Sequence, residues 1–80
     1  MPKVTLYTRL GCCLCADAKR VLAEARRRVP FDYEELDIDR DPDLRRRYND
    51  EIPVVDIDGA KAFKYKVDLM EFLKKLAARA

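Results

Sequence analysis

The feature that most constrains the fold of this sequence is a change of hydrophobic period near its start. Residues 3–8, KVTLYT, alternate in side-chain character and are rich in β-forming residues, which predicts a strand. From residue 14 to residue 29 the apolar residues recur at helical spacing, and Pro30 closes the predicted helix. A second strand, predicted over residues 31–39, follows directly. A strand, a crossover helix and a strand in so short a segment form a right-handed parallel unit, so the fold class is α/β.

The middle of the chain predicts a short helix followed by a hairpin. In DPDLRRRYN, Asp41 is the expected N-cap and Pro42 the first helical residue. IPVVDI, residues 52–57, predicts a third strand. The Asp-Gly pair that follows is a strong hairpin signal and leads into a fourth strand at residues 60–65.

The C-terminal segment predicts a third helix. Asp68 is the expected N-cap, Glu71 follows three residues later, and Val67 precedes the cap where it can pack against Phe72. The predicted order is therefore β-α-β-α-β-β-α, a mixed four-stranded sheet flanked by three helices. Its 80 residues are expected to form one domain, residues 1–80, near the smallest size that one core supports.

Charge and composition limit the kinds of partner that this chain is expected to bind. Hydrophobic residues make up 49% and charged residues 40% of the chain, and the net charge is only +2. The arginine runs at residues 26–28 and 45–47 lie beside acidic residues with no interleaved aromatic rings, which is typical of solvated helix faces and not of a nucleic-acid site. No stretch has the length of a signal peptide or a membrane span. We therefore expect a cytoplasmic protein with no nucleic-acid and no membrane partner.

All three cysteines, Cys12, Cys13 and Cys15, lie within four positions, and the chain has no histidine. Their number is odd and their spacing too short to join distant loops, which argues against a secreted disulfide framework. Cys12 falls at the predicted turn between the first strand and the first helix. There the unpaired N–H groups of the helix start, with Arg9 close in sequence, favour a thiolate.

This position predicts a division of labour among the sulfur atoms. A partly exposed thiolate at Cys12 is suited to attack a disulfide. Cys15 lies three residues on, where side chains of a first helical turn are neighbours, so it can attack a mixed disulfide on Cys12 and release the substrate. Cys13 points away from both partners, and we interpret it as a bystander or auxiliary thiol.

Metal binding is the alternative function for this cluster. Closely spaced thiolates suit Cu(I), Zn(II) or an iron–sulfur cluster. A closed zinc site needs four ligands, so three thiolates without an imidazole need a carboxylate, a second chain or an external thiol to complete it.

The segment VTLYTRLGCCLC at a strand-to-helix turn, followed by IPVV, a DG hairpin and a terminal helix, resembles the glutaredoxin-like branch of the thioredoxin superfamily over nearly the whole chain. The resemblance implies a thioredoxin-like fold and a thiol–disulfide oxidoreductase. It implies Cys12 as nucleophile, Cys15 as resolving cysteine and a redox-active Cys12–Cys15 disulfide. It further implies that Pro53 is a cis-proline and that the Ile52 backbone is free to pair with an extended thiol substrate.

The same resemblance bears on glutathione. Tyr7 and Arg9 occupy positions that glutaredoxins use around this tripeptide, and Asp68 matches an acidic residue that contacts its amine. The usual Pro-Tyr pair between the cysteines is replaced by Cys13-Leu14, and FKYK, residues 63–66, stands where the family has Gly-Gly. We expect glutathione or protein disulfides as substrates, glutathione as a co-substrate, no bound cofactor or metal, a reductase as a further partner, and a monomer.

Overall fold

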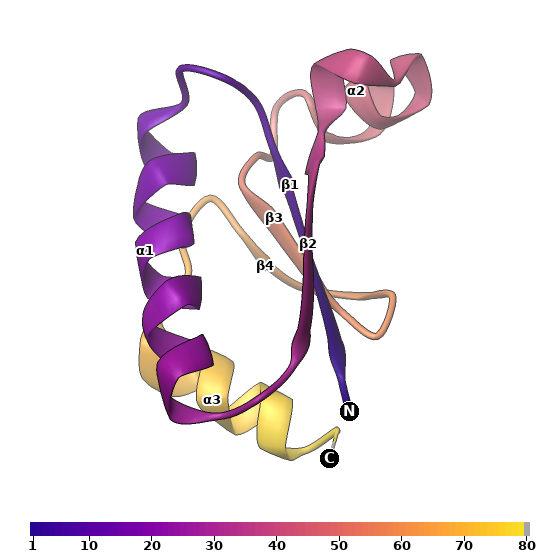
Figure 1. Ribbon diagram of the computed structural model, residues 1–80. Coiled ribbons are helices and arrows are strands. Elements are labelled where there is room, and N and C mark those ends of the chain that lie inside the picture. The colour runs from indigo at the N-terminus through magenta and orange to yellow at the C-terminus, as the bar shows by residue number, and fades with distance from the viewer. Residues whose placement is uncertain (80) are drawn as a thin grey trace.

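The chain folds into a four-stranded sheet with helices on both faces, as the computed structural model shows for residues 1–79 (Figure 1). The elements in chain order are β1 (Lys3–Thr8), α1 (Cys13–Arg28), β2 (Asp32–Asp37), a short 3-10 helix η1 (Ile38–Arg40), α2 (Pro42–Tyr48), β3 (Val54–Ile57), β4 (Ala60–Lys64) and α3 (Leu69–Ala77). The predicted order β-α-β-α-β-β-α is confirmed. Ala80, the last residue of the predicted domain, lies outside the described residues.

The sheet is mixed, as predicted, with the strand order β2-β1-β3-β4. β1 runs parallel to β2, to which α1 connects it, and antiparallel to β3. The hairpin of β3 and β4 completes the antiparallel half, with a register shift between Val55 and Asp56. β1 is therefore a central strand, and the segment that follows it leaves from the middle of one end of the sheet.

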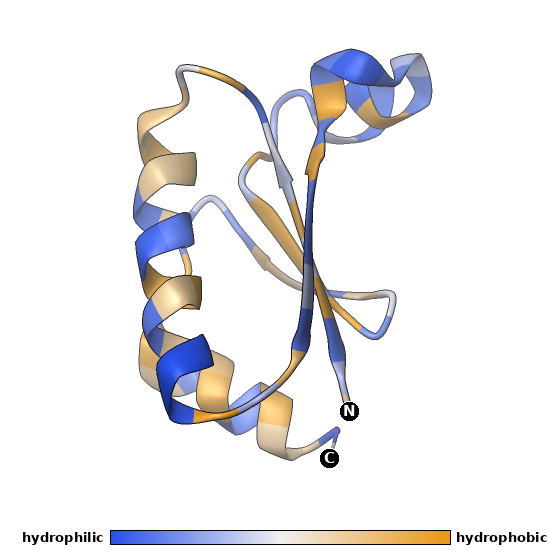
Figure 2. Ribbon diagram, in the orientation of Figure 1, coloured by the Kyte–Doolittle hydropathy of each residue, from blue (hydrophilic) through white to orange (hydrophobic). Residues whose placement is uncertain are grey.

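Two cores fill the space between the sheet and its helices. α1 and α3 cover one face, and α2 covers part of the other (Figure 1). In Figure 2, apolar colour runs along β3, whereas the edge strand β2 is mostly polar. The larger core lies on the α1 and α3 side and contains ten buried residues: Val4, Leu6, Ala18, Leu22, Ala25, Phe31, Val55, Ile57, Phe72 and Leu76. The smaller core lies beneath α2 and contains Ile38, Tyr48 and Val54.

Strand ends are where the sequence prediction is wrong. The second strand was expected to reach residue 39, but it ends at Asp37, whose carboxylate accepts a hydrogen bond of 2.9 Å from the Asp39 N–H and so begins η1. The fourth strand ends at Lys64, one residue early, because Tyr65 adopts a positive φ of 70°. The third strand begins at Val54 instead of residue 52.

Both predicted N-caps are confirmed. The Asp41 carboxylate accepts hydrogen bonds from the N–H groups of Asp43 and Leu44 at the start of α2. The Asp68 carboxylate accepts one of 2.9 Å from the Glu71 N–H at the start of α3.

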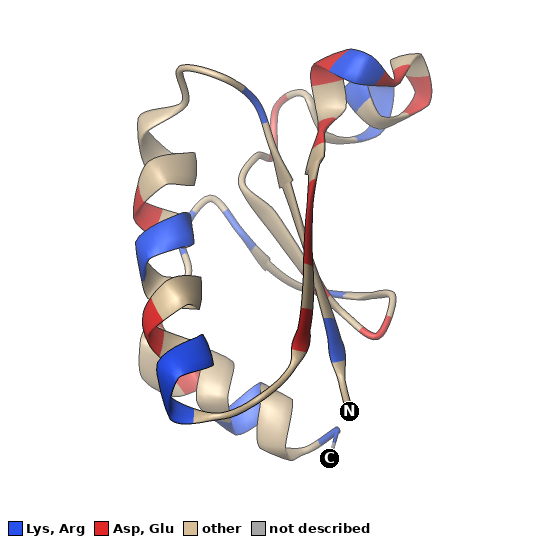
Figure 3. Ribbon diagram, viewed as in Figure 1, with Lys and Arg blue, Asp and Glu red and all other residues tan. Residues whose placement is uncertain are grey.

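The arginine runs find partners within the chain. Figure 3 shows basic and acidic residues alternating along α1 and α2. Arg27 and Arg28 pair with Glu24 on α1. On α2, Arg46 pairs with Asp43, and Arg45 reaches Asp39 of η1 at 3.3 Å. Separately, no helix within residues 1–79 has both the length and the apolar character needed to cross a membrane.

Candidate active site

The turn between β1 and α1 presents the cysteines. β1 ends at Thr8, and Gly11 then adopts a φ of +77°, a conformation that side chains with a Cβ rarely adopt. Cys12 follows with extended backbone angles and is the N-cap of α1. The conformation of Gly11 therefore sets the direction from which the chain enters the helix.

The Cys12 sulfur is held at the start of α1. Its Sγ accepts a hydrogen bond of 3.1 Å from the Cys15 N–H, the contact that a serine or aspartate oxygen makes at an ordinary N-cap. The Cys12 side chain is half-buried. The N-terminal end of a helix carries partial positive charge, which stabilises a negative sulfur at this position.

The other two thiols differ sharply in exposure. Cys13 is the first residue of α1 and is exposed, whereas Cys15 is only 1% exposed. Burial raises the pKa of the Cys15 thiol, and the neighbouring Cys12 raises it further, while the Thr8 side chain and the Arg9 backbone oppose this rise. All three cysteines are free thiols, and the surroundings of Cys15 favour its protonated form.

A surface groove of about 370 Å³ opens beside Cys12. Its lining residues are Arg9, Leu10, Gly11, Cys12, Cys13, Ala16 and Lys19. The sequence prediction missed Lys19, although its spacing of seven residues from Cys12 on one helix gave a usable signal. Lys19 also forms an ion pair of 3.5 Å with Glu35 on β2, so a cation and an open apolar surface share this groove.

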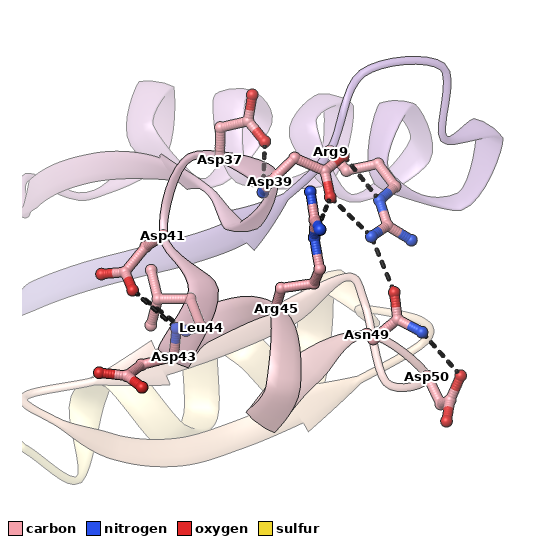
Figure 4. Close-up of polar contacts among 9 residues, drawn as sticks. All are labelled: Arg9, Asp37, Asp39, Asp41, Asp43, Leu44, Arg45, Asn49 and Asp50. Carbon is pink, nitrogen blue, oxygen red and sulfur yellow. Dashed lines mark hydrogen bonds and ion pairs between the residues drawn. The ribbon is translucent and has the colours of Figure 1, made fainter.

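Arg9 lies in the groove, but its guanidinium group is engaged by the neighbouring η1 and α2 (Figure 4). Its Nε and Nη2 donate to the two carboxylate oxygens of Asp39 at 3.0 and 2.8 Å, and Nη2 also donates to the side-chain oxygen of Asn49 at 2.8 Å. The hydrogen bond from Arg9 lowers the pKa of Asp39. Much of the positive charge that we expected for Cys12 is therefore balanced by Asp39.

Tyr7 is not part of this groove. Adjacent residues of a strand point to opposite faces, and Tyr7 stacks on Tyr48 of α2 with ring centroids 4.4 Å apart. Burial, followed by the nearby Asp56 carboxylate, raises the pKa of Tyr7 to about 12. Together with Asp56 and Lys61 it lines a separate cavity of about 490 Å³. The structure thus brings Tyr7 together with the smaller core and not with the Cys12 groove.

The Ile52-Pro53 peptide bond is cis, as the resemblance implied. The Ile52 backbone was expected to be free for a substrate, but its N–H donates a hydrogen bond of 3.2 Å to the Tyr48 carbonyl oxygen. The Pro53 carbonyl oxygen accepts a hydrogen bond of 2.9 Å from the Tyr65 N–H. Tyr65, which is 44% exposed, is therefore held beside the cis-proline, a neighbour that the sequence prediction missed.

Two further expectations concern Asp68 and metal. One carboxylate oxygen of Asp68 is occupied as the cap of α3, and the expected contact of Asp68 with a glutathione amine stays a prediction.

Within residues 1–79, no group of three or more histidine, cysteine or acidic side chains is arranged to hold a metal ion. The described residues therefore offer no preformed ligand set for the alternative function.

Comparisons with known proteins agree with this architecture. Residues 3–77 match the family model described as glutaredoxin-like domain (DUF836). An uncharacterized protein of Mycobacterium tuberculosis is 36% identical over 72 residues, which cover 84% of this chain and 74% of that protein. Among solved structures, a structural genomics target protein from X. campestris has a TM-score of 0.79 and 29% identity, over 94% of this chain and 96% of that chain.

A more distant neighbour extends the likeness of the fold. The Fasciola hepatica thioredoxin has a TM-score of 0.69 at 13% identity, over 99% of this chain and 81% of that chain, which shows a shared backbone arrangement. The family model covers nearly all of this chain and lies on the elements described above. The chain with its three clustered cysteines therefore belongs to the glutaredoxin-like family of thioredoxin-fold proteins.

Proposed function

We propose that this protein is a thiol–disulfide oxidoreductase in which Cys12 attacks and Cys15 resolves. The observation that carries the proposal is the position of the Cys12 sulfur as N-cap of α1, where it accepts the Cys15 N–H at 3.1 Å and stays partly exposed. A nucleophilic cysteine needs both thiolate stabilisation and access, and this position supplies both. The membership of the glutaredoxin-like family supports a redox role in general.

The reaction proceeds in two exchanges. The Cys12 thiolate attacks one sulfur of a substrate disulfide, so that a mixed disulfide forms and the other substrate sulfur leaves as a thiolate that takes up a proton. Cys15 then loses its proton and attacks the Cys12 sulfur. The Cys12–Cys15 disulfide forms, and the second substrate thiol leaves with a proton. The protein dithiol loses two electrons, and the substrate disulfide gains them.

The surface around Cys12 favours a protein disulfide over glutathione. Leu10, which lines the groove with Cys12, is 88% exposed, and elsewhere Leu14 and Tyr65 are 43% and 44% exposed, so apolar side chains are available for contacts with an extended polypeptide. Arg9, the expected partner of the glutathione carboxylate, is already engaged by Asp39 and Asn49. We propose that the reaction takes place in the cytoplasm, where reducing systems return such a disulfide to the dithiol.

Serine substitutions of the three cysteines test the proposal. Cys12→Ser should abolish disulfide reduction, and Cys15→Ser should trap a mixed disulfide on Cys12 and retain only reactions that external glutathione can complete. Cys13→Ser is the matched control: the variant should reduce disulfides at nearly the wild-type rate, because Cys13 is exposed and helical geometry directs its side chain away from those of Cys12 and Cys15. Peptide mapping of the oxidised wild-type protein should find a Cys12–Cys15 bridge. A bridge that includes Cys13, or loss of activity in Cys13→Ser, would contradict the assignment.

Two coupled assays separate the substrate classes. Reduction of a protein disulfide coupled to thioredoxin reductase is compared with reduction of a small mixed disulfide coupled to glutathione and its reductase. The proposed preference predicts the larger kcat/KM for the protein substrate. A rate that depends on glutathione alone would instead favour the tripeptide as the natural co-substrate.

A further inference from the structure

The groove beside Cys12 contains positively charged side chains, and the fold pairs each of them with a carboxylate. Among the residues that line it, Arg9 and Lys19 are the charged ones, and the others are apolar residues, a glycine and cysteines. Arg9 lies in the turn after β1, and Lys19 lies on α1. Two free cations beside a reactive thiol would attract anionic disulfides. The partners of these cations therefore decide which substrates the groove favours.

Both carboxylates come from the segment formed by β2 and η1. Asp39 of η1 accepts hydrogen bonds from Arg9 on its two oxygens, at 3.0 and 2.8 Å (Figure 4). Glu35 of β2 lies 3.5 Å from the Lys19 ammonium group. One stretch of chain on the edge of the sheet therefore balances the charge on both sides of the groove.

A further cation shares one of these carboxylates without belonging to the groove. Arg45 of α2 reaches Asp39 at 3.3 Å, but its side chain lines a different surface groove, with Arg46 and Asp50. Arg9 is instead held by two acceptors, because the Asn49 side-chain oxygen also accepts from its Nη2 at 2.8 Å. The guanidinium group that faces the Cys12 groove is thus the one that Asp39 holds with two hydrogen bonds.

Folding stability gives little reason for these two ion pairs. Their four side chains keep 29–43% of their surface exposed, and exposed ion pairs contribute little to the free energy of unfolding. Their effect on the local charge is larger, since removal of either carboxylate would leave an unbalanced cation at the edge of the groove.

We propose that Asp39 and Glu35 are positioning residues that set substrate specificity, because they keep the Cys12 groove nearly neutral and so remove its attraction for anionic small disulfides. Each acts through the cation with which it is paired. In the neutral groove, the exposed Leu10 can contact an apolar side chain next to a protein disulfide. The inference rests on the proposed oxidoreductase function and names the residues that set its preference for protein disulfides over glutathione, which carries more carboxylate than ammonium groups.

The first measurement is the rate at which Cys12 reacts with two aromatic disulfides of different charge. In a Cys13→Ser, Cys15→Ser background, anionic dithionitrobenzoate and neutral dithiodipyridine each form a mixed disulfide on Cys12 and release a coloured thiol. The thiolate fraction of Cys12 enters both rates, so their ratio reports the charge of the groove. Asp39→Asn and Glu35→Gln should each raise the anionic-to-neutral ratio about threefold, and the double variant about tenfold.

Matched variants separate charge from structure. Asp39→Glu keeps the charge and should keep the ratio of the parent protein. Glu71→Gln removes a carboxylate that pairs with Lys74 on α3, which lines no part of the groove, and should leave the ratio unchanged. Arg9→Gln in the Asp39→Asn background should return the ratio to its parent value, because the unbalanced cation is then absent. In about 0.5 M salt the gain should largely disappear.

The second measurement uses biological disulfides and the otherwise wild-type, reduced protein in single-turnover reactions. In the Asp39→Asn, Glu35→Gln variant, the rate with glutathione disulfide should rise severalfold relative to the rate with insulin disulfides. A reagent ratio that keeps its parent value in this double variant would overturn the role of both carboxylates, as would a rise that Glu71→Gln shares. A reduced wild-type protein that reacts with neither biological disulfide would instead refute the proposed function, and the reagent ratio would still decide the role of Asp39 and Glu35.

Discussion

At the scale of single residues, three cysteines in one turn have three different environments. Cys12 is the half-buried cap of a helix, Cys13 is exposed, and Cys15 is buried beneath them. The differences arise from helix geometry, because residues at the first, second and fourth positions of a turn point in different directions. Exposure and hydrogen bonding, and not the amino-acid type, therefore separate the chemistry of the three sulfurs.

This separation predicts the order in which the thiols react. Iodoacetamide at pH 7 should label Cys12 and Cys13 and leave Cys15 unlabelled on the same time scale, because burial both hides the Cys15 sulfur and raises its pKa. Its thiolate fraction is small at neutral pH and grows as pH rises, so labelling of Cys15 should appear only in alkaline solution. Mass mapping of peptides against pH measures this, with the protein in denaturant as the control in which all three react. Labelling of Cys15 at pH 7 as fast as that of Cys13 would contradict the geometry.

At the scale of elements, short polar caps decide where the helices begin. Asp41 and Asp68 each accept backbone N–H groups of the helix that follows, and the Asp37 side chain does the same for η1. These contacts join residues two or three apart in sequence, which is why the starts of α2 and α3 were predictable. Where a strand ends also depends on such local contacts, and the predicted strand ends were wrong.

Asp68 offers a test that separates a structural from a substrate role. Asp68→Ala removes the cap of α3 and should lower the free energy of unfolding by about 1 kcal/mol, whereas Asp68→Asn keeps a capping oxygen and should change it little. Thermal and denaturant unfolding measure both variants. If Asp68 also binds the amine of glutathione, Asp68→Asn should lose activity with glutathione while keeping its stability. An alanine variant as stable as the wild type would show that the cap contributes nothing.

At the scale of the whole molecule, the larger core joins both halves of the sheet to α1 and α3. Phe72 is fully buried at its centre, with its ring centroid 5.6 Å from that of Phe31 and 6.3 Å from that of Phe63. These rings come from α3, from the segment before β2, and from β4. One helix residue therefore links elements from three parts of the chain.

Phe72→Ala should remove a large part of the free energy of unfolding. Truncation of a buried phenylalanine costs about 3–5 kcal/mol, whereas a domain of this size has a total stability of about 4–12 kcal/mol. Denaturant unfolding should show a large loss or no folded state at 37 °C. Met70→Ala, on the same helix but 60% exposed, is the matched control and should change stability by less than about 0.5 kcal/mol. A Phe72→Ala protein as stable as the control would mean that this core does not hold the elements together.

The sequence by itself determined the element order, the mixed sheet, both aspartate caps and the position of Cys12 at a helix start. Each of these follows from periodicity or from contacts between residues a few positions apart. Only the tertiary structure decided that Arg9 binds Asp39, thirty residues away, and that Tyr7 stacks on Tyr48. Such pairs depend on which strand lies beside which and on which face each helix covers. Because that arrangement forms only when the whole core packs, no local pattern of residues could have specified these contacts.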